Sequence, residues 1–227
     1  MTPPLWAWGL SGDAHPLPGG HRNTVLRVGN HVVKSTRRTE AALRWLEEAQ
    51  DAAQACGLYA PRLVPSTDGT LCVAGWTCEP YLPGTPTDPA QISRHMTAFH
   101  QHAAHLAPRP GCAGALDLIT ADKGGDVDLS HMPRDLVRRL RAAWRALPDA
   151  HTTVHGDLTP DNILTTAEGR IVLLDWDEAR RDSPAFDRAT WDGSDPVATR
   201  AAQAWEIACC WQIEPDHARA LAHQFSN

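Results

Sequence analysis

The stretch that decides the fold is His155-Gly156-Asp157-Leu158-Thr159-Pro160-Asp161-Asn162-Ile163-Leu164. It fits the pattern H-x-D-x-x-x-x-N of a catalytic loop for phosphoryl transfer, with Asp157 and Asn162 five positions apart. A turn and a short apolar run follow, and this run ends in Leu173-Leu174-Asp175-Trp176-Asp177. Asp175 therefore comes directly after a buried strand, and the two segments together favour one phosphotransfer site over two unrelated turns.

Phosphoryl transfer to a hydroxyl group explains these residue types. One carboxylate must accept or orient the proton of the acceptor hydroxyl, while an amide oxygen and a second carboxylate hold Mg²⁺ on the phosphates. Carboxylate and carbonyl oxygens are the hard ligands that Mg²⁺ prefers. The spacing therefore predicts a magnesium-dependent phosphotransfer site.

A glycine-containing loop precedes the first predicted strands. Residues 18–23 read Pro-Gly-Gly-His-Arg-Asn, a composition that lets backbone N–H groups approach a ligand closely. Two short apolar runs follow, joined by Gly29-Asn30, and predict a β-hairpin that ends at Lys34. Lys34 and Lys123 are the two lysines, and the other nineteen basic residues are arginines. This contrast points to lysine-specific chemistry at Lys34.

These motifs resemble the aminoglycoside phosphotransferase family, also called choline kinase-like, of small-molecule kinases with a protein-kinase-like fold. The resemblance is carried by HGDLTPDN at 155–162, LLDWDEA at 173–179 with Asp187 downstream, and GGHRNTVLRVGNHVVK at 19–34. Together these runs extend over most of the chain.

For the catalytic loop, the resemblance implies that Asp157 is the catalytic base or orients the acceptor hydroxyl. His155 would brace the loop, and Asn162 and Asp175 would bind Mg²⁺. Asp187 is expected to be structural, tying the loop in place.

For the nucleotide, ATP or GTP, the resemblance implies binding by Gly19, Gly20, Lys34, Glu40 and Glu79. Lys34 would reach the α- and β-phosphates, beneath the two glycines. Glu40 is its expected ion-pair partner, but because they stand only six positions apart, Glu47 or Glu48 could take that role. Residues 77–81 would form the hinge against which the adenine ring lies.

The fold class predicted is α+β, a bilobal protein-kinase-like fold. A small antiparallel-sheet N-lobe would span residues 1–78, with one helix from an N-cap at Thr39 to about Cys56. Residues 79–89 contain four prolines and would form a stiff hinge, and residues 90–227 would form a mainly helical C-lobe.

Acidic charge is concentrated in one segment. The chain has 21 basic and 27 acidic residues, a net charge of −6, and residues 151–195 hold ten acids against four arginines. This segment alone therefore accounts for the whole excess. Around a catalytic loop it favours an acceptor that carries positive charge as well as a hydroxyl. Within it, Asp182 is expected only to face solvent.

The composition also limits the partners. The acidic balance argues against non-specific nucleic-acid binding, and no run approaches the ~20 apolar residues of a membrane span. The start, MTPPLWAWGL, lacks a basic region followed by a long apolar core, so we expect a cytoplasmic protein. Six cysteines without a CxxC pair are expected to be reduced thiols. The protein is expected to be a monomer or a homodimer.

The leading hypothesis is a phosphotransferase that moves the γ-phosphate of ATP or GTP to a small cationic alcohol. An aminoglycoside-like antibiotic or an amino alcohol would fit, with antibiotic resistance as one possible role. The alternative is a nucleotide-binding pseudokinase that serves as a regulatory module. A protein kinase is less favoured, because the chain has no APE motif. His95, His100, His102 and His105 share one predicted helix and favour a solvated face over a metal site.

Overall fold

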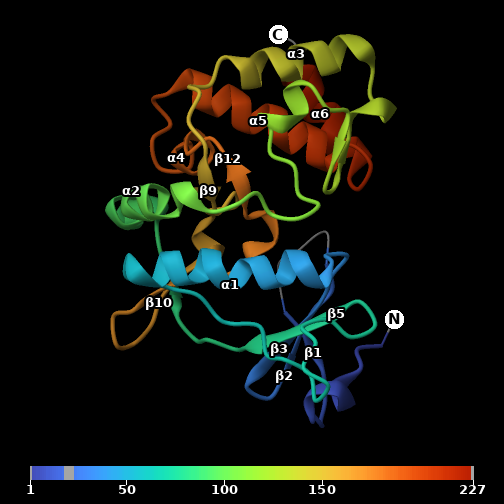
Figure 1. Ribbon diagram of the computed structural model, residues 1–227, viewed down its shortest axis with the longest axis vertical. Helices are drawn as coiled ribbons and strands as arrows, with labels where there is room; N and C mark the ends of the chain where they lie inside the picture. The colour runs from blue at the N-terminus through green and yellow to red at the C-terminus, as the bar shows by residue number, and fades with distance from the viewer. Residues whose placement is uncertain (1, 18–22, 226–227) are drawn as a thin grey trace.

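The N-terminal part is built on a four-stranded antiparallel sheet, seen at the bottom of Figure 1. The computed structural model describes residues 2–17 and 23–225. Strand order is β1 (His15–Pro16), β2 (Val25–Val28), β3 (His31–Ser35) and β5 (Trp76–Pro80). The predicted hairpin is confirmed: Val25 pairs with Lys34, and Val28 with His31.

The two faces of this sheet differ in chemistry. Because side chains alternate along a strand, Val33 of β3 and Cys78 of β5 point to one face, where they are fully buried in an apolar cluster. Their neighbours Lys34 and Thr77, which pair with each other across the two strands, point to the opposite face. The register thus sets Lys34 on the face turned away from the apolar cluster.

Helix α1 (Glu40–Ala55) crosses the middle of the molecule, between the sheet and the C-terminal helices (Figure 1). Thr39 caps it as predicted, since its side chain accepts a hydrogen bond from the Ala42 backbone N–H at 3.2 Å. Gly57, which follows the C-cap residue, has φ 82°. The buried face of α1 packs on α2 (Ser93–His102), with Leu46 and Phe99 in one apolar cluster.

A second sheet carries the predicted catalytic segments. Its order is β4 (Leu58–Tyr59), β11 (Ile171–Leu173), β10 (Ile163–Thr165) and β6 (Thr85–Pro86). β10 and β11 form an antiparallel hairpin, so the segment before β10 and the segment after β11 emerge at the same end. β9 (Thr152–Val154) and β12 (Arg180–Asp182) form a separate two-stranded antiparallel ladder.

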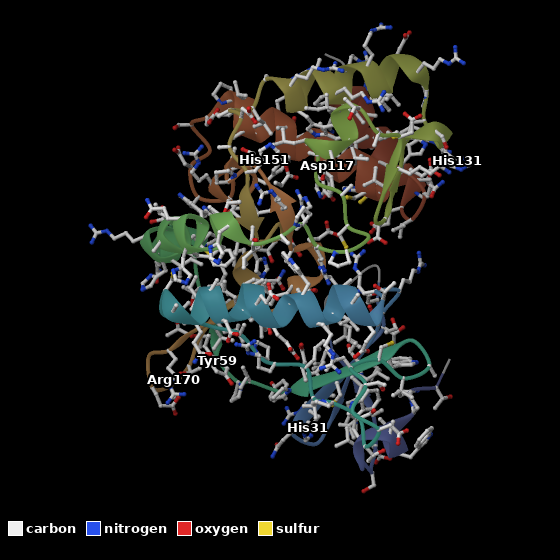
Figure 2. The ribbon with its side chains drawn as sticks, viewed as in Figure 1. His31, Tyr59, Asp117, His131, His151 and Arg170 are labelled. Carbon is white, nitrogen blue, oxygen red and sulfur yellow. The ribbon has the colours of Figure 1, made fainter. Side chains whose placement is uncertain are left out.

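The predicted hinge, residues 79–89, connects the two sheets. Glu79 and Pro80 still pair with β3, whereas β6 pairs with β10. An open cavity of about 440 Å³ lies at the second sheet, lined mainly by residues of the connector and of the β10–β11 turn. Tyr59 and Arg170, which both line it, lie at the same corner in Figure 2.

The C-terminal helices pack around a separate apolar core that contains Trp144 and Trp205. They are α3 (Arg134–Arg145), α4 (Ala185–Arg188), α5 (Pro196–Cys210) and α6 (Pro215–Phe225), with a small ladder of β7 (Lys123–Gly124) and β8 (Val127–Asp128). No helix in the described part of the chain is long and apolar enough to cross a membrane.

Candidate active site

Lys34 and the segment after β11 meet between the two sheets. The Lys34 Nζ atom lies 2.5 Å from Asp175 Oδ1 and 3.2 Å from Asp177 Oδ2. Burial by itself would lower the pKa of the Lys34 ammonium, but Asp177 and Asp175 outweigh it and raise that pKa above its usual value. Burial would likewise raise the pKa of Asp177, but the charges of Lys34 and Arg38 lower it. The Lys34 ammonium and the Asp177 carboxylate are therefore both held in their charged forms.

Asp175 adopts a backbone conformation that is unusual for a side-chain-bearing residue. Its φ of 51° and ψ of 71° lie in the left-handed region, which Asp tolerates better than most residues. The conformation ends the strand abruptly, and the Asp175 side chain caps the following turn by accepting from the Asp177 N–H. Such strained residues cluster at functional sites, because the surrounding structure must hold them in place.

The catalytic-loop motif places Asp157 and Asn162 in direct contact. The Asn162 amide nitrogen donates to the Asp157 carboxylate at 2.9 Å and to its backbone carbonyl at 3.0 Å. Burial, together with the negative charges of Asp175 and Glu178, raises the pKa of Asp157 despite the opposing effects of His155 and Asn162. Asp157 thus lies within electrostatic reach of Asp175.

His155 and Asp187 fix the catalytic loop through buried hydrogen bonds. The His155 ring is fully buried, and its Nε2 atom is 2.8 Å from the Leu174 carbonyl, next to Asp175. The Asp187 carboxylate accepts hydrogen bonds from the backbone N–H groups of His155 and Gly156, at 2.9 and 2.8 Å. The prediction that Asp187 ties the loop is therefore confirmed.

Gly156 cannot carry a side chain here. Its φ is 86°, and a Cβ atom would lie 2.7 Å from the Glu178 carbonyl oxygen and 2.6 Å from the Arg180 guanidinium. Glycine is thus required at this position of the HGD motif, because Glu178, just before β12, and Arg180, the first residue of β12, approach its backbone closely.

His100 has a role that the sequence did not reveal. The interpretation of its helix as a solvated histidine face is wrong for this residue, which is buried with its Nε2 atom 2.8 Å from Asp187 Oδ2. Burial alone would raise the pKa of Asp187, but the hydrogen bond and charge of His100, with the Gly156 N–H, lower it. His100 thus supports the catalytic loop through Asp187.

Two arginines that the motif search missed fix the segment after Asp175. Arg109 is buried and donates to the backbone carbonyls of Trp176, Asp177 and Ala179 at 2.9–3.1 Å. Its Nε atom donates to Ala42 on α1, so one side chain links α1 to the Asp175–Asp177 turn. Arg38 donates to the Asp177 carbonyl from the other side. An arginine between two prolines, at Pro108 and Pro110, offered little signal for this role.

The expected ion pair between Lys34 and Glu40 is wrong. Glu40 begins α1 and its carboxylate accepts from the Leu71 backbone N–H at 3.1 Å and from Arg44 at 2.9 Å. Glu47 also pairs with Arg44, and Glu48 is exposed. The connection from β3 to α1 is too short to turn the first helical residues back towards Lys34. Asp175 and Asp177, instead of a glutamate, contact the Lys34 ammonium.

Glu79 remains close to Lys34. The charges of Lys34, Asp175 and Asp177 all act on it, and burial raises its pKa to about 7. A carboxyl group that titrates near neutrality therefore borders the cluster on the side of the hinge. Gly19 and Gly20, the other expected nucleotide residues, lie outside the described residues.

Much of the acid excess is structural. Asp182 does not face solvent as expected: it is fully buried, with Arg180 Nε at 2.8 Å. Asp195 caps α5, and Asp192 accepts from the Ser194 N–H. These carboxylates stabilise local structure. Asp157, Asp161, Asp175, Asp177 and Glu178 belong to the predicted catalytic loop or to the turn after β11.

The site suits a divalent cation. The carboxylates of Asp175 and Asp177 both contact one positive charge, the Lys34 ammonium. Asn162 commits its amide nitrogen to Asp157, so its carbonyl oxygen is the atom that can bind a metal. Two carboxylates and an amide oxygen form the hard donor set that Mg²⁺ prefers.

An antiparallel sheet that presents a lysine to the carboxylates of a helical lobe defines a protein-kinase-like phosphotransferase. The chain belongs to the phosphotransferase enzyme family (APH), whose sequence model matches residues 13–220. Members of this family are ATP-dependent phosphotransferases of small molecules.

Solved structures share this fold at low sequence identity. The choline kinase LicA from Streptococcus pneumoniae matches with a TM-score of 0.65 and 12% identity, over 96% of this chain and 93% of that chain. The amicoumacin kinase hAmiN, solved with AMP-PNP, Ca²⁺ and Ami, matches with a TM-score of 0.62 and 15% identity, over 98% and 84%. A microcompartment-associated aminopropanol kinase matches with a TM-score of 0.59 and 14% identity, over 98% and 92%. Among curated proteins, none is significantly similar to this chain.

Proposed function

We propose that this protein transfers the γ-phosphate of ATP or GTP to a hydroxyl group of a small, positively charged molecule. The observation that carries the proposal is the convergence of Lys34 with Asp175 and Asp177, beside an Asp157 carboxylate that Asn162 holds at 2.9 Å. Phosphoryl transfer needs a lysine for the phosphates, hard ligands for Mg²⁺ and a carboxylate for the acceptor hydroxyl.

In this proposal Asp157 is the catalytic residue, which accepts or orients the proton of the acceptor hydroxyl. The hydrogen bond from Asn162 fixes its carboxylate, so that a proton acceptor is already in position when the acceptor binds. His155 is a positioning residue, because its ring bonds to the Leu174 carbonyl rather than to the Asp157 carboxylate.

Asn162 and Asp175 would hold Mg²⁺, with Asp177 beside them. When bound, the ion neutralises negative charge that builds up on the phosphates. Lys34 would contribute a second positive charge to the phosphates. Gly19 and Gly20 would cover the phosphates, and Glu79 would lie beside the nucleobase of the nucleotide. Glu79 would belong to a hinge at residues 79–89, between lobes 1–78 and 90–227.

The acceptor is proposed to carry a positive charge. Besides burial, the charges of Asp175 and Glu178 raise the pKa of Asp157, so negative potential acts on the carboxylate beside which the acceptor hydroxyl is proposed to bind. Two of the structurally similar proteins are named as kinases of choline and of aminopropanol, which are amino alcohols. An amino alcohol or an aminoglycoside-like antibiotic therefore suits this site.

The proposed location is the cytoplasm, where the protein would act as a monomer or homodimer. Cys56, Cys72, Cys78 and Cys112 are thiols, a state that a reducing compartment preserves.

The test is to incubate the purified protein with Mg²⁺ and either ATP or GTP, together with a panel of amino alcohols, aminoglycosides and neutral sugars. Mass spectrometry should find one acceptor that gains a phosphoryl group, and none should gain it with Asp157→Asn. Binding of nucleotide without turnover of any compound would favour the nucleotide-binding pseudokinase instead.

The charge of the acceptor needs a separate measurement. With the best acceptor in hand, its KM should rise with salt, because ions screen the attraction between an amine and the acidic site. A neutral best acceptor, or a KM that is indifferent to salt, would overturn the cationic acceptor and leave the phosphotransferase standing.

A further inference from the structure

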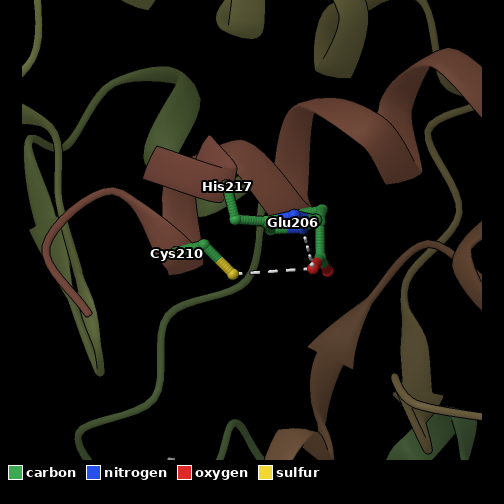
Figure 3. A group of neighbouring side chains, drawn as sticks. All are labelled: Glu206, Cys210 and His217. Carbon is green, nitrogen blue, oxygen red and sulfur yellow. Dashed lines mark hydrogen bonds and ion pairs between the residues drawn. The ribbon is translucent and has the colours of Figure 1, made fainter. Parts of the chain in front are cut away.

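Three side chains with different metal-binding atoms meet between the last two helices. Glu206 and Cys210 stand one turn apart on α5, and His217 lies in the first turn of α6 (Figure 3). The ligand atoms of all three side chains, a carboxylate oxygen, a thiol sulfur and an imidazole nitrogen, lie within 4.8 Å of one another. This cluster has no part in the proposed phosphotransfer site.

Two of the three distances among these ligand atoms match those around a tetrahedral zinc ion. Cys210 Sγ lies 3.5 Å from Glu206 Oε1, and His217 Nε2 lies 3.4 Å from the same oxygen. Zinc bonds of about 2.3 Å to sulfur and about 2.0 Å to nitrogen and oxygen, set at tetrahedral angles, place sulfur and oxygen about 3.5 Å apart and nitrogen and oxygen about 3.3 Å apart. The side chains thus need little movement to surround one ion.

We propose that Glu206, Cys210 and His217 bind one Zn²⁺ ion, with water at the fourth position. The mixed set of sulfur, nitrogen and oxygen suits zinc, whereas Mg²⁺ prefers the all-oxygen set around Asp175. Binding deprotonates the Cys210 thiol: the S–H bond breaks, a sulfur–zinc bond forms, and the proton leaves to the buffer. In the metal-free protein the His217 ring nitrogen and the Cys210 thiol both contact the Glu206 carboxylate.

The fold brings these residues together before any metal arrives. A tight turn joins the helices, with the Glu214 backbone N–H donating to the Cys210 carbonyl at 2.8 Å. Cys210 is buried on α5, while Glu206 and His217 are exposed, so an ion can enter from solvent. A preformed and accessible site binds metal without first having to fold.

Zinc at this site would fasten the start of α6 to α5. The opposite end of α6 is already held, because the Arg200 guanidinium stacks on Phe225 at 4.1 Å and donates to its carbonyl at 3.1 Å. Only Ala218 and Phe225 of this helix are buried. A metal bond at its first turn therefore adds a second fixed point to a lightly packed helix.

The full-length protein, stripped of metal with a chelator, is titrated first with Zn²⁺ and then with Co²⁺, in excess Mg²⁺ to occupy the oxygen-rich site. We expect one zinc per chain, a higher melting temperature with zinc, and a Co²⁺ spectrum with a thiolate charge-transfer band. Cys210→Ser should remove that band, and His217→Ala, an exposed change that leaves the core intact, should weaken zinc binding at least about tenfold.

Matched controls lie close by. His223→Ala, also exposed on α6, and Cys56→Ser, a cysteine on another helix end, should leave zinc affinity and the cobalt spectrum unchanged. The proposal is overturned if zinc does not bind, if the cobalt complex shows no thiolate band, or if His217→Ala binds zinc as tightly as the unmodified protein.

Discussion

The ammonium group of Lys34 lies 2.5 Å from the carboxylate of Asp175, although the two residues are 141 positions apart in the chain. One belongs to the sheet of the N-terminal part and the other to the turn after β11. Their contact ties the two halves of the proposed site together. It also places one positive charge against the neighbouring carboxylates of Asp175 and Asp177.

Lys34→Ala should lower both nucleotide affinity and turnover, because it removes a positive charge from the phosphates. It should also destabilise the metal-free protein, since Asp175 and Asp177 then lose the positive charge that contacts both carboxylates. Mg²⁺ should therefore raise the melting temperature of the variant by more than that of the unmodified protein.

The matched control is Lys123→Ala, the other lysine of the chain, which pairs with Asp128 at the surface. It should leave kinetics and melting temperature unchanged. Equal effects of the two substitutions would show that the contact with Asp175 has no special role.

Asp157→Asn should abolish turnover while leaving the fold and nucleotide binding intact. An amide is nearly isosteric with the carboxylate but cannot take the acceptor proton, a loss that typically lowers kcat about 10²–10⁴-fold. Steady-state kinetics and a nucleotide-binding titration should be run on the same preparation. A kcat near that of the unmodified enzyme would exclude Asp157 as the base.

The acid limb of the pH–rate profile should lie above the ordinary range of an aspartate. Burial and the charges of Asp175 and Glu178 raise the pKa of Asp157, and only its ionised form can accept a proton. Activity should therefore fall as pH drops through this raised pKa. A rate that stays constant down to the usual aspartate range would contradict this account.

Glu79 should make the protein less stable as pH rises. The folded protein keeps the Glu79 proton up to about pH 7, whereas an unfolded chain loses it near 4.5, the ordinary pKa of a glutamate. Ionisation is thus easier in the unfolded chain, and the free energy of unfolding falls between these two pH values. Glu79→Gln should remove the effect and stabilise the protein above pH 7 by about 1–3 kcal/mol.

Urea unfolding of both proteins at pH 4.5 and pH 8 measures this difference. The advantage of Glu79→Gln should be larger at pH 8. An advantage that is the same at both pH values would mean that folding does not raise the pKa of Glu79.

Asp187→Asn should weaken both stability and catalysis. The Asp187 carboxylate contacts the backbone N–H groups of His155 and Gly156 and the His100 ring. In the variant one of its oxygens is replaced by an NH₂ group, which cannot accept a hydrogen bond. A buried donor left without its acceptor costs about 1–3 kcal/mol. The loss of kcat should exceed any change in nucleotide affinity, because the loop that carries Asp157 loosens.

Asp192→Asn is a suitable control for this change, since Asp192 is exposed and only caps a nearby turn. Thermal melting and steady-state kinetics should separate the two variants clearly. If both behave alike, the buried contacts of Asp187 do not hold the catalytic loop.

The sequence predicted the fold class and most of the local structure, because these depend on short-range patterns. The spacing of Asp157 and Asn162 fits one loop, and the Thr39 cap and Gly57 mark the ends of α1. The Gly29-Asn30 turn likewise sets the register that orients Lys34.

The partners of charged side chains were decided only by the tertiary structure. Glu40 was expected at Lys34 but faces Leu71, and Asp182 was expected in solvent but is buried on Arg180. The sequence did not reveal the contacts of His100 and Arg109, since nothing near them in the chain points to Asp187 or to the Asp175–Asp177 turn. Neighbours in sequence determine the backbone conformation, whereas an ion pair or a buried hydrogen bond depends on which distant segments the packing of α1, α2 and the second sheet brings within a few ångströms.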